Sequence, residues 1–219
     1  MNQELIIQKT IEFVKNELKN AEGGHDWFHI ERVFKNAILI SKEEKVDVFV
    51  VSLGALLHDI ADPKFYNGDE TIGPKKAKIF LKKQNVNSDI INHIINIIKH
   101  ISFKNSFDKN GEKFTSTELE IVQDADRLDA IGAIGIARCF NYGGFKNREI
   151  YNPEILPNLQ MTKEEYKKSD APTINHFYEK LLLLKDKMNT ASGKRIAAER
   201  HKYMQQFLNQ FYNEWNGVK

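Results

Sequence analysis

The sequence of 219 residues contains one cysteine, Cys139, only five prolines and no long apolar run. A single cysteine cannot form an internal disulfide, and it excludes zinc sites built from several thiolates. No apolar stretch approaches the roughly 18 residues that span a bilayer. The first residues also lack the basic segment and apolar core of a secretory signal. We therefore expect a cytoplasmic protein with no membrane partner.

The sequence also lacks an excess of charge of either sign, because it contains 32 basic and 30 acidic residues and its formal net charge is +2. Without a basic stripe interleaved with aromatic residues, a nucleic-acid partner is not expected. The glycine pattern GxGxxG of dinucleotide-binding folds is absent. The segment 192–195 hints at a phosphate-binding P-loop, but Met188 stands where that loop requires glycine. Nucleotide-binding folds built on a strand followed by a glycine-rich loop are therefore excluded.

The apolar residues of the sequence recur with helical periodicity, whereas the alternation of apolar and polar residues that is typical of strands is scarce. We predict an all-α fold and one domain over residues 1–219, with a core at about 20–140 and a C-terminal helical extension at about 141–219. Irregular segments are expected at 63–72, 104–114 and 145–172, with a capping box at Thr162–Glu165 inside the last. Helices are predicted from about residue 5 to 18, 26 to 44, 47 to 62, 74 to 84, 88 to 100, 117 to 140, 174 to 188 and 191 to 215.

One apolar helical segment, Ser52–Asp62, ends in three polar residues that could bind a cation. His58 and Asp59 are neighbours about 100° apart on a helix, and Asp62 follows one turn later. Buried charge is costly unless it is paired or bound to a metal. Further groups that could ligate a metal stand at 25–29, at His93 and His100, and at 124–129. Mixed imidazole and carboxylate ligands suit Mn, Fe, Co, Ni, Zn or Mg.

The order of these motifs resembles the HD-domain superfamily of metal-dependent phosphohydrolases. Within it, the sequence is similar to a small bacterial branch of predicted nucleotide hydrolases. The likeness is clearest over residues 24–140 and weaker towards the C-terminus. The segments that carry it are HDWFHIERV at 25–33, ALLHDIAD at 55–62, ISFK at 101–104 and QDADRLDAIGAIGIAR at 123–138.

The resemblance implies an HD-domain helical bundle with additional C-terminal helices and one divalent metal ion. The implied ligands are His29, His58, Asp59 and Asp126.

Two of these four positions have rivals nearby. His25 lies four residues before His29, although the family pattern favours His29. Asp124 lies about 200° from Asp126 on a helix, so the two cannot easily face the same ion. On the isoleucine-rich helix expected over 88–100, His93 and His100 are expected to form a solvated polar stripe. A role for His100 at a second metal or a phosphate stays open.

The resemblance further implies hydrolysis of a small phosphorylated substrate, a nucleotide. The favoured reaction cleaves a (deoxy)nucleoside triphosphate to a monophosphate and pyrophosphate, with manganese among the candidate metals. The alternatives are a nucleotide phosphomonoesterase or phosphodiesterase, or a metal-bearing nucleotide sensor or partner-binding module without turnover. The sequence does not set the oligomeric state, and a homo-oligomer is compatible with it.

Two sets of residues are candidates for the chemistry around the metal. Asp62 and Asp129 lie one turn from implied ligands and are expected to position water or accept its proton, or equally to orient a histidine. Phosphate requires cations, and the candidates are Lys64, Arg32, Lys104 and Arg127. Gly132 and Gly135, inside a predicted helix, indicate close packing against a neighbour.

Overall fold

The computed structural model describes residues 2–19, 21, 24–61, 66, 68–101, 114–162, 165 and 169–218. The candidates Asp62, Lys64 and Lys104 lie outside these residues. Throughout the described ranges the regular structure is helical and no strand occurs, which confirms the all-α prediction. No helix in this part of the chain is long and apolar enough to cross a membrane. The cytoplasmic location stays a prediction.

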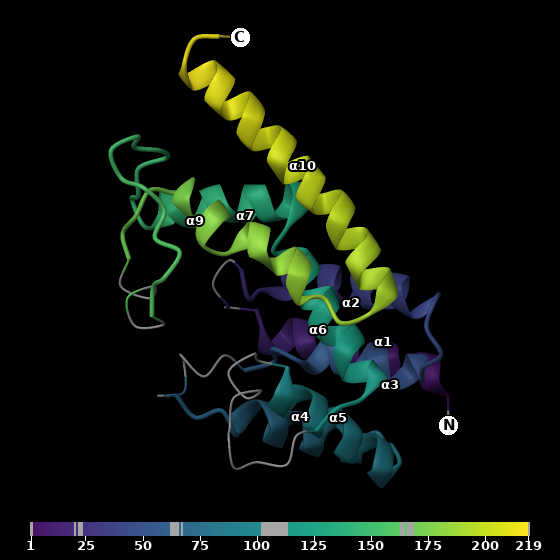
Figure 1. The fold of residues 1–219 in the computed structure, drawn as a ribbon. Coiled ribbons are helices and arrows are strands. Elements are labelled where there is room, and N and C mark those ends of the chain that lie inside the picture. Colours follow the sequence, from purple (N-terminus) through teal and green to yellow (C-terminus); the bar gives the residue numbers. More distant parts are fainter. Residues whose placement is uncertain are drawn as a thin grey trace. The chain divides into compact units, whose positions relative to one another are not determined.

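Contacts along the chain divide it into two compact units, Met1–Asp126 and Arg127–Lys219. The boundary lies inside one helix, α6, so the single domain with a core at about 20–140 stays a prediction. The first unit contains α1 (Gln3–Glu17), α2 (Trp27–Ser41), α3 (Val48–Leu57), α4 (Ile72–Lys83), α5 (Ser88–His100) and most of α6 (Thr117–Asp129) (Figure 1). The second contains the end of α6, α7 (Gly132–Phe145), α9 (Asn175–Glu179), the 3₁₀-helix η3 (Leu181–Lys187) and α10 (Ala191–Trp215).

The core of the first unit is built around α3, which is buried from Phe49 to Leu57. This helix packs against α1, α2 and α5. It begins at Asp47, whose carboxylate accepts hydrogen bonds from the backbone of Phe49 and Val50. Because α3 is buried from Phe49 to Leu57, the packed core of the unit holds its C-terminal end in place. His58 and Asp59 follow directly after this end.

Two predicted helices are interrupted in the structure. The helix expected over 117–140 is split into α6 and α7, because Gly132 has a φ of +74°, a left-handed conformation that glycine adopts without strain. The helix expected over 174–188 is the short α9 followed by η3, with the break at Lys180. Gly132 therefore begins a new helix and does not lie inside one. The close packing expected of it is confirmed, since a Cβ at this position would lie 3.0 Å from the side chain of Arg200 on α10.

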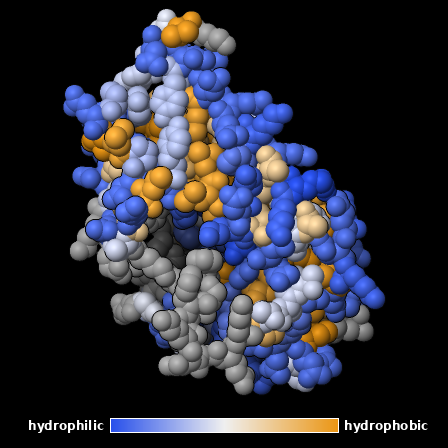
Figure 2. Space-filling model, in the orientation of Figure 1, coloured by the Kyte–Doolittle hydropathy of each residue, from blue (hydrophilic) through white to orange (hydrophobic). Residues whose placement is uncertain are grey.

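The second unit has an aromatic core in which Phe177 lies against Phe140 and Phe207. Burial raises the pKa of the Cys139 thiol to about 12, so this residue packs as a small apolar side chain. The predicted capping box forms, since Thr162 and Glu165 exchange hydrogen bonds. Figure 2 shows hydrophobic residues gathered in the part that holds α7, α9 and α10. Exposed apolar side chains of this unit include Phe145, Ile150, Leu156 and Leu159.

Candidate metal centre

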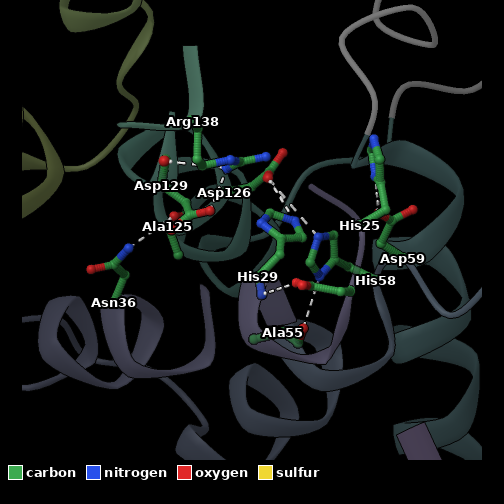
Figure 3. A network of polar contacts seen from close by, with 11 residues as sticks. His25, His29, Asn36, Ala55, His58, Asp59, Ala125, Asp126, Asp129 and Arg138 are labelled. Carbon is green, nitrogen blue, oxygen red and sulfur yellow. Dashed lines mark hydrogen bonds and ion pairs between the residues drawn. The ribbon is translucent and has the colours of Figure 1, made fainter. Parts of the chain in front are cut away.

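Three side chains from distant parts of the sequence come together in the first unit (Figure 3). His29 lies on α2, His58 directly follows α3, and Asp126 lies on α6. Asp126 Oδ1 is 3.6 Å from His29 Nε2 and 4.0 Å from His58 Nε2. Both imidazoles are buried, whereas the Asp126 side chain is 42% exposed, so the cluster is accessible to solvent on its carboxylate side.

Local hydrogen bonds fix both segments that carry the histidines. The Asp26 carboxylate caps α2 and accepts the backbone N–H of His29 at 2.9 Å. His58 Nδ1 lies 2.8 Å from the carbonyl oxygen of Ala55. A carbonyl can only accept, so Nδ1 carries the proton and the lone pair remains on Nε2. This nitrogen is the one that approaches Asp126, in the arrangement typical of histidine ligands.

The distances and the donor atoms fit a divalent ion. Separations of 3.6 and 4.0 Å exceed the roughly 2.7–3.2 Å of an N–H···O hydrogen bond. Two ligand atoms that each lie about 2.0–2.2 Å from one ion can be separated by up to about 4.3 Å. The two separations from Asp126 lie inside this limit, and all three donor atoms are no more than 4.8 Å apart. Two imidazoles and a carboxylate therefore form a set that can hold one transition-metal ion.

Asp59, the fourth implied ligand, is not part of this cluster of three. Its Oδ2 lies 2.6 Å from Nδ1 of His25. Burial would raise the pKa of Asp59, but the hydrogen bond from His25 and the charges of His58, His25 and His29 together lower it below the ordinary value. The carboxylate is thus held ionised, close to both cluster histidines. Its role as a ligand stays a prediction.

The two rival positions differ clearly in geometry. His25 precedes α2 and contacts Asp59, while His29 faces His58 and Asp126. Asp124 is completely buried and lies outside the cluster. The geometry therefore favours His29 over His25 and Asp126 over Asp124.

Two further candidates, Asp129 and Arg127, have partners in the second unit. Asp129 is 1% exposed, and its carboxylate pairs with the guanidinium of Arg138. Arg127 Nη1 donates to the carbonyl oxygen of Lys187 at 2.7 Å. Both side chains thus have a structural partner at the end of α6, and their catalytic and substrate-binding roles stay predictions.

The remaining candidates in the described part lie in the first unit. Arg32 lies on α2, one turn after His29. His100 Nδ1 is 2.8 Å from the carbonyl oxygen of Asn96. His93 is not simply solvated, since its Nε2 lies 2.9 Å from Ser116 Oγ. A role for His100 at a second metal or a phosphate stays the open alternative to a solvated stripe.

Sequence reasoning missed two residues that organise the site. It did not identify His25 as the partner of Asp59, and the sequence signal is only that a histidine precedes the cap of α2. It also passed over Asn36, whose Nδ2 donates to the carbonyl oxygen of Ala125 at 3.3 Å. This bond joins α2 to α6 one residue before Asp126. The available signal was that Asn36 stands among the apolar positions of α2, where a buried amide needs a hydrogen-bond partner.

Comparisons with known proteins identify the family of this chain. A family model described as HD domain matches residues 27–131. The protein YpgQ of Bacillus subtilis is 36% identical over 208 residues, which cover 94% of this chain and 92% of YpgQ.

Two solved structures are similar over nearly the whole chain. An HD-superfamily hydrolase from Bacillus thuringiensis is 44% identical with a TM-score of 0.80, covering 98% of this chain and 99% of that one. The structure of B. subtilis YpgQ in complex with ADP is 33% identical with a TM-score of 0.76, covering 98% of this chain and 97% of that one. Together with the ordered histidine and aspartate motifs, these matches show that the chain belongs to the HD-domain family.

Proposed function

We propose that this protein is a divalent-metal-dependent phosphohydrolase that acts on nucleotides. The observation that carries the proposal is the cluster of His29, His58 and Asp126, accessible from solvent at its carboxylate. The similarity to an HD-superfamily hydrolase over almost the full length of both chains supports a hydrolytic reaction.

The complex of B. subtilis YpgQ with ADP supports a nucleotide as the substrate. Within that class, the favoured reaction converts a (deoxy)nucleoside triphosphate to a monophosphate and pyrophosphate. Cleavage of a phosphomonoester or phosphodiester is the alternative, and binding without turnover would make the protein a sensor. Manganese is among the candidate ions.

Four side chains of the first unit supply the binding site for the ion. A bound divalent ion would lower the pKa of a water ligand and offset the charge that develops on the phosphoryl oxygens. His29 and His58 contribute neutral nitrogens, and the bond from His58 to Ala55 fixes the orientation of its ring. Asp126 and Asp59 contribute two negative charges, which balance a divalent cation.

The substrate phosphates require positive charge beside this site. Arg32, one turn from His29, is the candidate cation that the first unit supplies within the described residues. Lys64 and Lys104 remain candidates from the sequence. The proton acceptor for the attacking water is assigned to Asp62, because Asp129 is buried against Arg138.

The test is a substrate panel with separate detection of each product. Protein stripped with a chelator is reloaded with Mn²⁺, Mg²⁺, Co²⁺, Ni²⁺ or Zn²⁺ and incubated with nucleoside tri-, di- and monophosphates and with cyclic nucleotides. Release of pyrophosphate from a triphosphate supports the favoured reaction, and release of phosphate from a monophosphate supports a phosphomonoesterase. Conversion of a cyclic nucleotide to a monophosphate supports a phosphodiesterase. The His58→Ala variant should show no turnover above background. Nucleotide binding without products, for every metal, would contradict an enzymatic function.

A further inference from the structure

A short hydrogen bond beside the cluster joins His25 to Asp59. Nδ1 of His25 lies 2.6 Å from Oδ2 of Asp59, across 34 positions of sequence. The two side chains are 38% and 20% exposed, so the bond is partly shielded from water. A carboxylate can only accept, and His25 therefore donates from Nδ1.

This bond joins the two chain segments that carry the cluster histidines. His25 stands just before Asp26, the cap of α2, and α2 carries His29 in its first turn. Asp59 directly follows His58 at the end of α3. The start of α2 is thus tied to the end of α3 beside the metal centre.

The bond also leaves one oxygen of Asp59 for another partner. Oδ2 is engaged by His25, and Oδ1 has no hydrogen bond recorded among the described residues. A carboxylate that ligates a metal commonly has its second oxygen held by a hydrogen bond, which fixes the rotation of the group. We propose that His25 is a positioning residue, which holds Asp59 so that Oδ1 serves as the fourth ligand of the metal.

The inference rests on the metal site of the proposed function and assigns His25 a role other than ligand. Nδ1 of His25 carries the proton of the bond to Asp59, so this nitrogen cannot ligate a metal. Neither His25 nor Asp59 belongs to the group of His29, His58 and Asp126, so the bond to His25 is what keeps the Asp59 carboxylate beside that group. The two roles make different demands on a replacement side chain. A positioning role needs only a donor at the place of Nδ1.

Substitution by asparagine or glutamine tests whether His25 needs only a donor at the place of Nδ1. The amide nitrogen of asparagine lies close to where Nδ1 of histidine lies, while that of glutamine reaches the place of Nε2. We therefore compare His25→Asn, His25→Gln and His25→Ala. His93→Ala serves as the matched control, because His93 is a hydrogen-bonded histidine of the same unit that contacts Ser116 and Glu118.

The measurement is Mn²⁺ affinity by titration calorimetry, with the visible spectrum of Co²⁺-loaded protein as a second readout. His25→Ala and His25→Gln should weaken Mn²⁺ binding by about 10- to 100-fold. His25→Asn should stay within about threefold of the wild type, and His93→Ala should equal it. The Co²⁺ spectrum of His25→Ala should resemble that of Asp59→Asn, because both lose the same oxygen ligand. Circular dichroism confirms that each variant is folded.

Each other result counts against the inference. Wild-type Mn²⁺ affinity in His25→Ala would overturn it, and equal loss in His25→Asn and His25→Ala would indicate that His25 ligates directly. If the wild type binds Mn²⁺ but hydrolyses no nucleotide, the proposed function fails while the pattern of affinities still decides the role of His25. If the wild type binds no divalent ion, both fail.

Discussion

The guanidinium of Arg138 caps the C-terminal end of α6 at Asp129. Its Nη1 donates to both the carboxylate and the carbonyl oxygen of that residue. Asp129 is almost completely buried, whereas Arg138 is partly exposed. Arg200 adds a second guanidinium at this end by donating to the carbonyl oxygen of Leu128. Two cations thus satisfy carbonyl groups that a helix end leaves without intrahelical donors.

Removing Arg138 should therefore destabilise the fold strongly. In Arg138→Met the buried Asp129 carboxylate loses the guanidinium that contacts it, and we expect a loss of about 3 kcal/mol in the free energy of unfolding. The double variant Asp129→Asn/Arg138→Met should lose less than the sum of the single variants, because the side chain that Arg138 leaves behind is then a neutral amide. Urea denaturation of the four proteins measures this coupling, and strictly additive losses would contradict it.

The two aspartates Asp124 and Asp126 should respond differently to the same substitution. Asp126→Asn should keep the fold and lose the stabilisation by Mn²⁺, because the exposed carboxylate faces His29 and His58. At a metal concentration 100 times the dissociation constant, that stabilisation amounts to about 2.7 kcal/mol in the wild type.

Asp124→Asn should lower the stability of the metal-free protein instead, because its side chain is completely buried. Thermal melts of both variants with and without Mn²⁺ compare the two effects. A wild-type metal response in Asp126→Asn would show that Asp126 is not a ligand.

Neighbouring glycines in α7 provide a matched pair for packing. A Cβ on Gly143 would overlap the side chain of Thr173, whereas a Cβ on Gly144 would meet nothing within 4 Å. Gly143→Ala should cost about 1–3 kcal/mol through overpacking. Gly144→Ala should be neutral or stabilise by up to about 1 kcal/mol through helix propensity.

The same pair has an internal check. Thr173→Ala should recover part of the loss in the Gly143→Ala background, since it removes the atoms that a Cβ would overlap. Chemical denaturation of the variants measures the effect. If the double variant recovers no stability, the loss in Gly143→Ala does not come from overlap with Thr173.

His176 should make the stability of the protein depend on pH. Burial, with the charges of Lys180 and Arg148, lowers the pKa of His176 to about 4, against about 6.5 in the unfolded chain. Between these values the unfolded state binds more protons, so stability falls as the pH decreases through this window. From pH 7 to pH 5 this group alone should cost about 2 kcal/mol.

The comparison is with His176→Gln, which does not titrate. Denaturation curves at several pH values should show the wild type losing about 2 kcal/mol more than the variant between pH 7 and pH 5. Parallel losses in both proteins would show that His176 titrates normally in the folded state.

The sequence alone was sufficient to predict much of the first unit and of the site. Apolar periodicity located α2, α3 and α5, and the motif order identified His29, His58 and Asp126, which the structure brings together. This worked because ligands on packed helices are set by the register of each helix. Helical geometry indicated only that Asp124 and Asp126 cannot easily face one ion, and the family resemblance favoured Asp126.

The errors and omissions lie where a single backbone torsion or a loop decides the outcome. The break before α7 depends on the positive φ of Gly132, and helical periodicity does not reveal it. The change from α9 to a 3₁₀-helix is likewise invisible in a run of four leucines. The contact between His25 and Asp59 depends on the path of the chain before α2, which no repeating pattern specifies.

Because α6 continues from one compact unit into the other, Asp126 is the last residue before the boundary. A shortened chain ending there would leave the carbonyl groups of its final turn without donors, and the terminal residues of such a helix fray. We therefore expect that removing the C-terminal portion would loosen the carboxylate that faces the two buried imidazoles.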